Sequence, residues 1–129
     1  MIASEKTLDW LGHYYALVDA ERMEESATFF AEDARLLFAN NETIVGRDGI
    51  DATLRGLVES LDGIRHDIKG VWEEEGGVLI YEVDVTYTRK DGGVVTCPGA
   101  VASLVEDELF QEQRIYVDIT PVFAGMGAA

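Results

Sequence analysis

Residues 78–89 of the chain, VLIYEVDVTYTR, decide its fold class. Apolar and polar side chains alternate there, and the two-residue period of a β-strand places alternate residues on opposite faces. One face carries Leu79, Tyr81, Val83, Val85 and Tyr87. The other carries Glu82, Asp84, Thr86 and Thr88. Two arrangements stay open. The apolar face packs on the core with the carboxylates in water, or helices cover the polar face and a second subunit covers the apolar one.

Further strand patterns flank this stretch at about 64–73, 93–105 and 109–119. Short connections rich in turn residues separate the four stretches, namely Gly76-Gly77, Lys90-Asp91-Gly92-Gly93 and Glu106-Asp107-Glu108. Connections of this length join antiparallel neighbours. The second half of the chain therefore predicts a mostly antiparallel sheet built from consecutive hairpins.

The first half has the pattern of helices. Ser4 is suited to cap a first helix. The apolar residues of that helix recur at three- and four-residue spacing, which is one helix face: Leu8, Leu11, Tyr14, Tyr15 and Val18. A second, shorter helix contains Met23, Ala27 and Phe30, and we expect it to end near Asp33.

Two short strand candidates follow at 35–38 and 43–45, with a turn at Asn40-Asn41 between them. A third helix is expected to open at Gly46 and to end at Asp62-Gly63. Helices that precede a run of strands predict an α+β fold in layers.

Length and charge narrow the classes of function. The chain has 129 residues with 10 Lys+Arg and 25 Asp+Glu, a net charge of −15. We expect one domain over 1–129, with a loose tail from about 124. The negative charge argues against nucleic acid and anionic membranes as partners. No apolar run reaches the ~20 residues of a spanning helix, no signal-peptide core is seen, and Cys97 is the single cysteine. These features predict a cytoplasmic protein.

Several short segments together resemble a known family. They are YYALVD at 14–19, FAEDA at 30–34, GRDGI at 46–50, YTRKDG at 87–92, and RIYVD at 114–118 followed by Pro121. In order and spacing they are similar to the nuclear transport factor 2-like superfamily, in the branch of SnoaL-like polyketide cyclases, ketosteroid isomerases and limonene-epoxide hydrolases. The resemblance implies a cone-shaped curved sheet wrapped around three N-terminal helices. It also implies a pocket for a small apolar molecule beside the first helix, and a homodimer through the outer sheet face.

The catalytic positions of these relatives can be carried over one by one. Tyr14 stands where the ketosteroid isomerases have a tyrosine, whereas Phe38 stands at their base and Val101 near their acid. Asp84 and Asp118 stand at the two aspartates of the limonene-epoxide hydrolases. Glu82 occupies the position of the hydrolase arginine, and Leu36 and Phe38 occupy the water-holding positions. The SnoaL-like cyclases need one acidic group late in the sheet, for which Asp118 or Asp84 would serve.

The candidate catalytic residues are therefore Asp118, Asp84, His66 and Tyr14. Alternation places His66 on the side of Ile64 and Ile68, facing inward. There it is either a pocket base paired with an aspartate on a neighbouring strand or a buried histidine bonded to a backbone carbonyl. Tyr14 is either a pocket hydrogen-bond donor or a core residue. Each aspartate either exchanges protons in the pocket or is a solvated or backbone-bonded carboxylate. No spacing typical of metal ligands and no cofactor motif is present.

Three functions remain open. The first is a cofactor-independent acid/base enzyme (a cyclase, isomerase or hydrolase) acting on an apolar, oxygen-bearing substrate. The second is a binding protein for a small apolar ligand. The third is a dimeric interaction domain whose pocket is filled by Leu36 and Phe38, which a cavity below ~300 Å³ would favour. The dimer would use the apolar sheet residues, namely Leu79, Tyr81, Val83, Val85, Ile115 and Val117.

Overall fold

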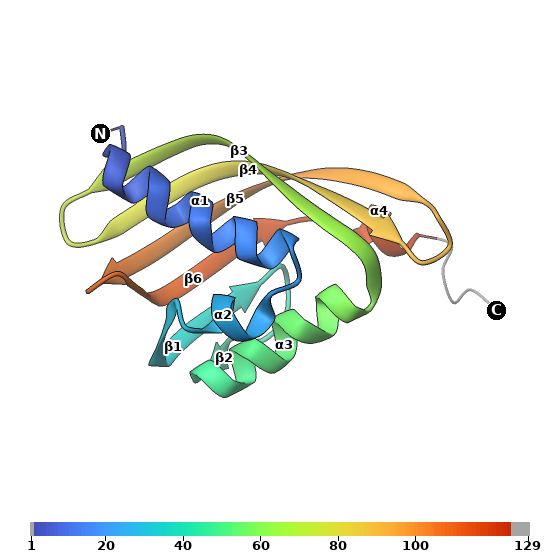
Figure 1. Cartoon of the computed structure of the whole chain (residues 1–129), viewed down its shortest axis with the longest axis horizontal. Coiled ribbons are helices and arrows are strands. Elements are labelled where there is room, and N and C mark those ends of the chain that lie inside the picture. Colours follow the sequence, from blue (N-terminus) through green and yellow to red (C-terminus); the bar gives the residue numbers. More distant parts are fainter. Residues whose placement is uncertain (1, 125–129) are drawn as a thin grey trace.

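The structure is a computed structural model, and it describes residues 2–124. Helices lie along one side of a curved sheet (Figure 1). The expected α+β architecture is confirmed. Apart from Ala124, the tail predicted to be loose lies outside the described residues.

Within residues 2–124 the sheet has six strands: β1 (Phe30–Phe38), β2 (Ile44–Val45), β3 (Leu61–Glu74), β4 (Val78–Arg89), β5 (Val94–Glu106) and β6 (Leu109–Val117). Their spatial order is β2-β1-β6-β5-β4-β3. The last four strands pair antiparallel in chain order, as predicted. β1 pairs parallel with β6 and antiparallel with β2, so the sheet is mixed and β3 forms its far edge.

The helices of the described part are α1 (Glu5–Asp19), α2 (Met23–Ala27), α3 (Arg47–Glu59) and α4 (Thr120–Phe123). Ser4 caps α1 as predicted, because its Oγ accepts the Thr7 N–H at 3.2 Å. Glu73 of β3 then ties this end to the sheet, since its carboxylate accepts the Ser4 N–H at 3.1 Å and the Thr7 hydroxyl at 2.7 Å. With its first turn anchored to β3, α1 packs on the sheet and ends at Asp19, which contacts His66 of the same strand.

The second helix is shorter than predicted. It ends at Ala27, and β1 begins at Phe30, so its continuation to Asp33 is wrong. Phe30 is 1% exposed, and its ring lies 5.1 Å from that of Phe110 on β6, the residue with which it also pairs in the sheet. This packing between segments distant in sequence outweighs the local helical spacing.

Two further boundaries differ from the prediction. The third helix ends at Glu59, and the pair Asp62-Gly63 lies inside β3, where the pairing with β4 shifts register. The last strand ends at Val117 rather than 119. There the carboxylate of Asp118 accepts the Thr120 N–H at 3.0 Å and turns the chain into α4. In both places a local bond or bulge sets the boundary.

The structure resolves which face of β4 the helices cover. The apolar residues Leu79 to Tyr87 are at most 5% exposed and belong to the core shared with the helices. Glu82 on the opposite face is exposed. The first of the two open arrangements is therefore the one adopted. The dimer surface predicted from Leu79, Tyr81, Val83, Val85, Ile115 and Val117 is wrong, because these side chains lie beneath the chain's own helices.

Candidate functional site

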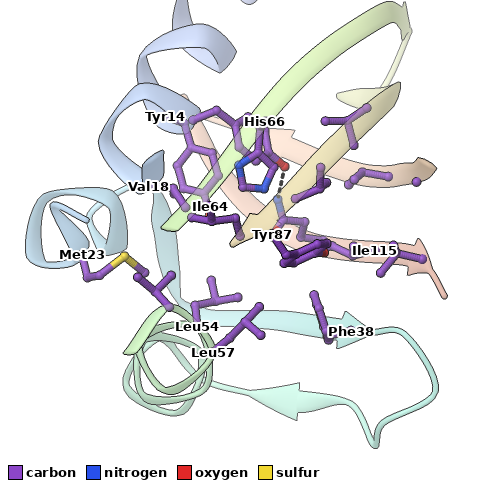
Figure 2. A pocket seen from close by; sticks show the side chains of 18 residues that line it. Tyr14, Val18, Met23, Phe38, Leu54, Leu57, Ile64, His66, Tyr87 and Ile115 are labelled. Atoms are coloured by element: carbon purple, nitrogen blue, oxygen red, sulfur yellow. Dashed lines mark hydrogen bonds between the residues drawn. The ribbon is translucent and has the colours of Figure 1, made fainter. Parts of the chain in front are cut away.

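A cavity lies between α1, α3 and the concave face of the sheet (Figure 2). Most of its wall is apolar, with side chains from both layers: Val18, Met23, Leu54, Leu57, Ile64 and Ile115. The polar side chains in the wall are Tyr14, Tyr15, Tyr87, His66 and Gln113. Among the described residues, no Asp, Glu, Lys or Arg side chain lines the cavity. The site therefore suits a neutral, largely apolar molecule.

The cavity is small. Its volume is about 50 Å³, whereas drug-sized ligands occupy pockets of ~300 Å³ or more. At ~10–15 Å³ for each water-sized group, it has room for about three to five such groups. Phe38 lines the cavity and narrows it, as the sequence suggested, whereas Leu36 is fully buried and does not reach the wall. A compact ligand fits, and a larger one requires the side chains at the wall to move.

His66 is held by Asp19, the last residue of α1. His66 Nδ1 and Asp19 Oδ1 are 2.6 Å apart, and the other oxygen, Oδ2, accepts the His66 backbone N–H at 3.0 Å. β3 is an edge strand, and this N–H is satisfied by Asp19 rather than by a neighbouring strand. The carboxylate thus fixes both the backbone and the ring of His66.

This bond also determines the proton on the ring. A carboxylate can only accept, so Nδ1 carries the hydrogen, and Nε2 is the nitrogen that bears the lone pair of the neutral ring. No hydrogen bond to Nε2 is seen within residues 2–124. The ring lines the cavity, packs against Tyr15 with centroids 4.5 Å apart, and has a side chain only 11% exposed. The arrangement resembles the carboxylate–imidazole pairs that serve as general bases.

The predicted inward orientation of His66 is thus what the structure shows. The partner that the sequence suggested was an aspartate on a neighbouring strand, and the structure has Asp19 of α1 instead. In the sequence, Asp19 stands out only as the last residue of the family-like segment YYALVD. Nothing in the spacing of two residues 47 positions apart indicates that the end of α1 lies beside β3.

A second polar group joins α1 to the sheet deeper in the core. The hydroxyls of Tyr15 and Tyr81 are 2.6 Å apart. Gln113 Nε2 donates to Tyr81 Oη at 3.2 Å and to Tyr15 Oη at 3.5 Å, the bond dashed in Figure 2. Burial raises the pKa of Tyr15 and of Tyr81 above the usual value, and the neighbouring Tyr81 hydroxyl raises that of Tyr15 further. Both phenols therefore stay neutral.

Tyr14 is 2% exposed and lines the cavity. Its ring lies among aromatic neighbours, with centroids 4.8 Å from Tyr15 and 5.2 Å from Phe110. Burial raises the pKa of its hydroxyl, with the Tyr81 hydroxyl as a second cause, although a hydrogen bond with Gln113 opposes them. Tyr14 is thus a neutral hydroxyl at the wall, in the place that the sequence predicted, and its role there remains a prediction.

Asp84 and Asp118 lie away from the cavity. Asp84 falls between Val83 and Val85, which line the cavity, so its side chain projects from the opposite face, 3.7 Å from Lys69 Nζ. Asp118 follows the end of β6, and its hydrogen bonds to Thr120 hold the pKa of its carboxyl below the usual range. The expectation that these carboxylates face the pocket is wrong, because the helices cover the other face of the sheet.

Gln113 was missed by the sequence interpretation. Its position two residues before Ile115 and four before Val117 places it on the inward face by simple alternation. An amide among inward apolar residues is the signal that could have found it. Among residues 2–124, no group of three or more His, Cys, Asp or Glu side chains is placed to hold a metal ion, and no helix is long and apolar enough to cross a membrane.

Comparisons with known proteins agree with this architecture. The sequence model of the SnoaL-like domain family matches residues 11–113. A search of curated protein sequences finds no match. A candidate SnoaL-like polyketide cyclase from Jannaschia sp. CCS1 is similar in structure, with a TM-score of 0.79, 16% identity, and coverage of 100% of this chain and 99% of that one.

Two other solved structures share the fold. One is a candidate scytalone dehydratase from Novosphingobium aromaticivorans, with a TM-score of 0.76, 19% identity, and coverage of 87% of this chain and 81% of that one. The other is a protein with a ketosteroid isomerase-like fold from Catenulispora acidiphila, in complex with trimethylamine. Its TM-score is 0.80, its identity 17%, and the coverage 93% of both chains. Since the family match spans most of the sequence, the chain belongs to the SnoaL-like domain family, and it has the nuclear transport factor 2-like fold.

Proposed function

We propose that the protein is a small-molecule pocket protein that catalyses proton transfer on a compact, apolar substrate bearing a carbonyl group. The observation that carries this proposal is the Asp19–His66 pair in the wall of an otherwise apolar cavity. Acid/base catalysis needs a base with a fixed tautomer and neutral hydrogen-bond donors beside it, and the cavity wall has both. Asp84 and Asp118, which lie outside the cavity, have no part in it.

The proposed step begins with His66. Its Nε2 removes a proton from the carbon next to the substrate carbonyl, and the electron pair of that C–H bond forms the enolate. The Tyr14 hydroxyl donates a hydrogen bond to the developing oxyanion. The His66 imidazolium, stabilised by the Asp19 carboxylate, exchanges its Nε2 proton with solvent and then returns a proton to the same carbon. Where the substrate is a β,γ-unsaturated ketone and the anion is a dienolate, the proton goes to the γ-carbon instead. Exchange or isomerisation of this kind needs no cofactor.

Support for a compact substrate comes from the cavity volume of about 50 Å³. The similar structure from Catenulispora acidiphila was obtained with trimethylamine, which is itself a compact molecule. Relatives named as candidate cyclase and candidate dehydratase fit an acid/base role. Which carbonyl compound is the natural substrate is a question for a panel of small ketones.

The test is deuterium exchange. The protein is incubated in D₂O with small ketones such as butanone, and incorporation at the carbons next to the carbonyl is followed by NMR. We expect exchange above the buffer rate that falls by roughly 10²–10⁴-fold in His66→Ala. The matched control is His13→Ala, because His13 does not line the cavity. Exchange that is equal in wild type and His66→Ala would overturn the proposal.

A second candidate is binding without chemistry, or an interaction domain with a nearly filled pocket. The observation that favours it is the same small volume, well below ~300 Å³. A ligand that binds and is recovered without deuterium would support simple binding. A protein that neither binds nor exchanges any of the ketones would support the interaction domain.

A homodimer through the outer sheet face is also part of the proposal, with different residues from those first predicted. Four large side chains on that side are between 36% and 51% exposed: Trp72, Ile80, Leu104 and Tyr116. Light scattering at micromolar concentration should give twice the chain mass, and Trp72→Glu should shift it to the monomer. A single domain over 1–129 and a cytoplasmic location complete the proposal, the latter supported by the lone Cys97.

A further inference from the structure

Gln113 is one of three polar side chains at the wall of the cavity that the proposed proton transfer does not use, together with Tyr15 and Tyr87. It lies on β6, is 1% exposed, and faces inward between the sheet and α1. Amides are costly to bury unless both ends find partners. The pairing of its two ends therefore indicates what the residue does.

The two ends of the Gln113 amide differ in their hydrogen bonding. Nε2 donates to the hydroxyls of Tyr81 and Tyr15, so its hydrogens are used within the protein. Oε1 is buried and has no hydrogen-bond partner, and it is the one such buried side-chain atom among the described residues. A carbonyl oxygen accepts and cannot donate. Gln113 lines the cavity, so it brings one unfilled acceptor to the wall, and the other end of the amide is bonded to two tyrosines.

We infer that Gln113 is a specificity-determining residue that selects ligands carrying a hydroxyl group. A hydroxyl hydrogen satisfies Oε1, whereas a methyl group in the same place leaves the oxygen buried and unpaired. An anionic ligand is disfavoured because no Arg or Lys side chain lines the cavity in the described part of the chain. The inference rests on the proposed function for the location of the substrate, and it narrows the substrate class to small hydroxy-ketones.

The geometry of the wall supports the combination of two oxygen groups. Tyr14 and Gln113 both line the cavity, so a donor for a carbonyl and an acceptor for a hydroxyl belong to the same wall. A ligand whose hydroxyl and carbonyl are on neighbouring carbons presents the complementary pair. His66 lines the same cavity.

The test uses two ketones of equal size. Hydroxyacetone and butanone differ only in a hydroxyl against a methyl group, and their dissociation constants are measured by NMR titration. We expect wild type to bind hydroxyacetone roughly three- to tenfold more tightly than butanone. Gln113→Leu should remove this preference, and Gln111→Leu on the same strand should keep it, because Gln111 does not line the cavity. Equal or tighter binding of butanone by wild type would overturn the inference.

Two features keep the outcome interpretable. The comparison within wild type decides the matter even where Gln113→Leu fails to fold, and binding of neither ketone would overturn the inference for compact ligands. Deuterium exchange on butanone separates the two proposals. Exchange that depends on His66, without a preference for hydroxyacetone, overturns only the role of Gln113. A preference for hydroxyacetone without exchange overturns only the acid/base function.

Discussion

Asp19 binds His66 through both carboxylate oxygens, one to the ring at 2.6 Å and one to the backbone N–H at 3.0 Å. The two residues come from different layers of the fold, the end of α1 and the edge strand β3. The contact therefore links the packing of the helix on the sheet to the orientation of one imidazole in the cavity wall. A substitution of Asp19 should therefore alter the orientation of the His66 ring before it affects the rest of the protein.

Asp19→Asn should reduce proton exchange on butanone by roughly 10²-fold or more. The amide can donate to Nδ1, which favours the wrong tautomer and takes the lone pair away from Nε2. The rate constant kcat/KM from deuterium incorporation measures the loss. Asp84→Asn and Asp118→Asn are the matched controls, and both should exchange at the wild-type rate, because neither residue lines the cavity. If the exchange rate of either control fell by the same factor, that aspartate would take part in the reaction and the account would be wrong.

Phe38→Ala should enlarge the cavity and destabilise the protein. The ring is 8% exposed and lines the wall, so its removal costs about 3 kcal/mol of unfolding free energy, at the low end for Phe→Ala because the site already borders a void. Urea unfolding measures this, and Phe38→Leu should cost about 1 kcal/mol. Cyclohexanone should bind the Ala variant more tightly than wild type. No gain for the larger ketone would show that Phe38 does not limit the cavity.

Buried tyrosines should make the protein sensitive to alkali. Burial raises the pKa of Tyr87 to about 12 and raises the values of Tyr14, Tyr15 and Tyr81 as well. In the unfolded chain a tyrosine titrates near ~10. The stability that these groups contribute is therefore complete below about pH 10 and is lost as the pH rises above it. The measurement uses a Tyr116→Phe variant, because Tyr116 is exposed. In that variant tyrosinate absorbance should appear together with unfolding, whereas its appearance in the folded state would contradict the burial of the other four tyrosines.

Glu73 should contribute to stability at neutral pH and lose that contribution in acid. Its bonds to Thr7 and to the Ser4 backbone hold the pKa of its carboxyl below the usual value. A depressed folded pKa means that the contribution is present above the unfolded value, ~4.3, and is lost as the pH falls through the folded one. Glu73→Gln should have a lower urea midpoint than wild type at pH 7. In acid the midpoints of the two proteins should lie closer together. Glu75→Gln, at the exposed turn, is the control, and its urea midpoint should match that of wild type both at pH 7 and in acid.

Much of the fold follows from local pattern. The spacing of Tyr14, Tyr15 and Val18 predicts the buried side of α1, and the alternation in β4 predicts which residues share a face. Alternation does not say which face the helices cover, so it leaves open whether Asp84 faces the pocket. Phe30 shows a second limit, since its pairing with Phe110 across 80 positions overrides a local helical pattern.

The candidate site was predictable only in part. His66 and Tyr14 face inward because of the period of their own elements, which a sequence displays. The partners of a polar side chain depend on how elements cross in space. Asp19 meets His66 at one end of α1 while Ser4 and Thr7 meet Glu73 at the other, so both ends of the helix lie beside β3. The unpaired oxygen of Gln113 is likewise a property of packing, since two tyrosines from different elements use the other end of the amide.

The measurement that tests the central claim most directly is the ¹⁵N NMR spectrum of the His66 ring, with and without butanone. The signals are assigned with a His13→Gln variant, since His13 and His66 are the two histidines. The account predicts a proton on Nδ1, a bare Nε2, and a shift of the Nε2 signal when butanone is added. A proton on Nε2, or an Nε2 signal that saturating butanone leaves unchanged, would contradict the assignment of His66 as the base in this cavity.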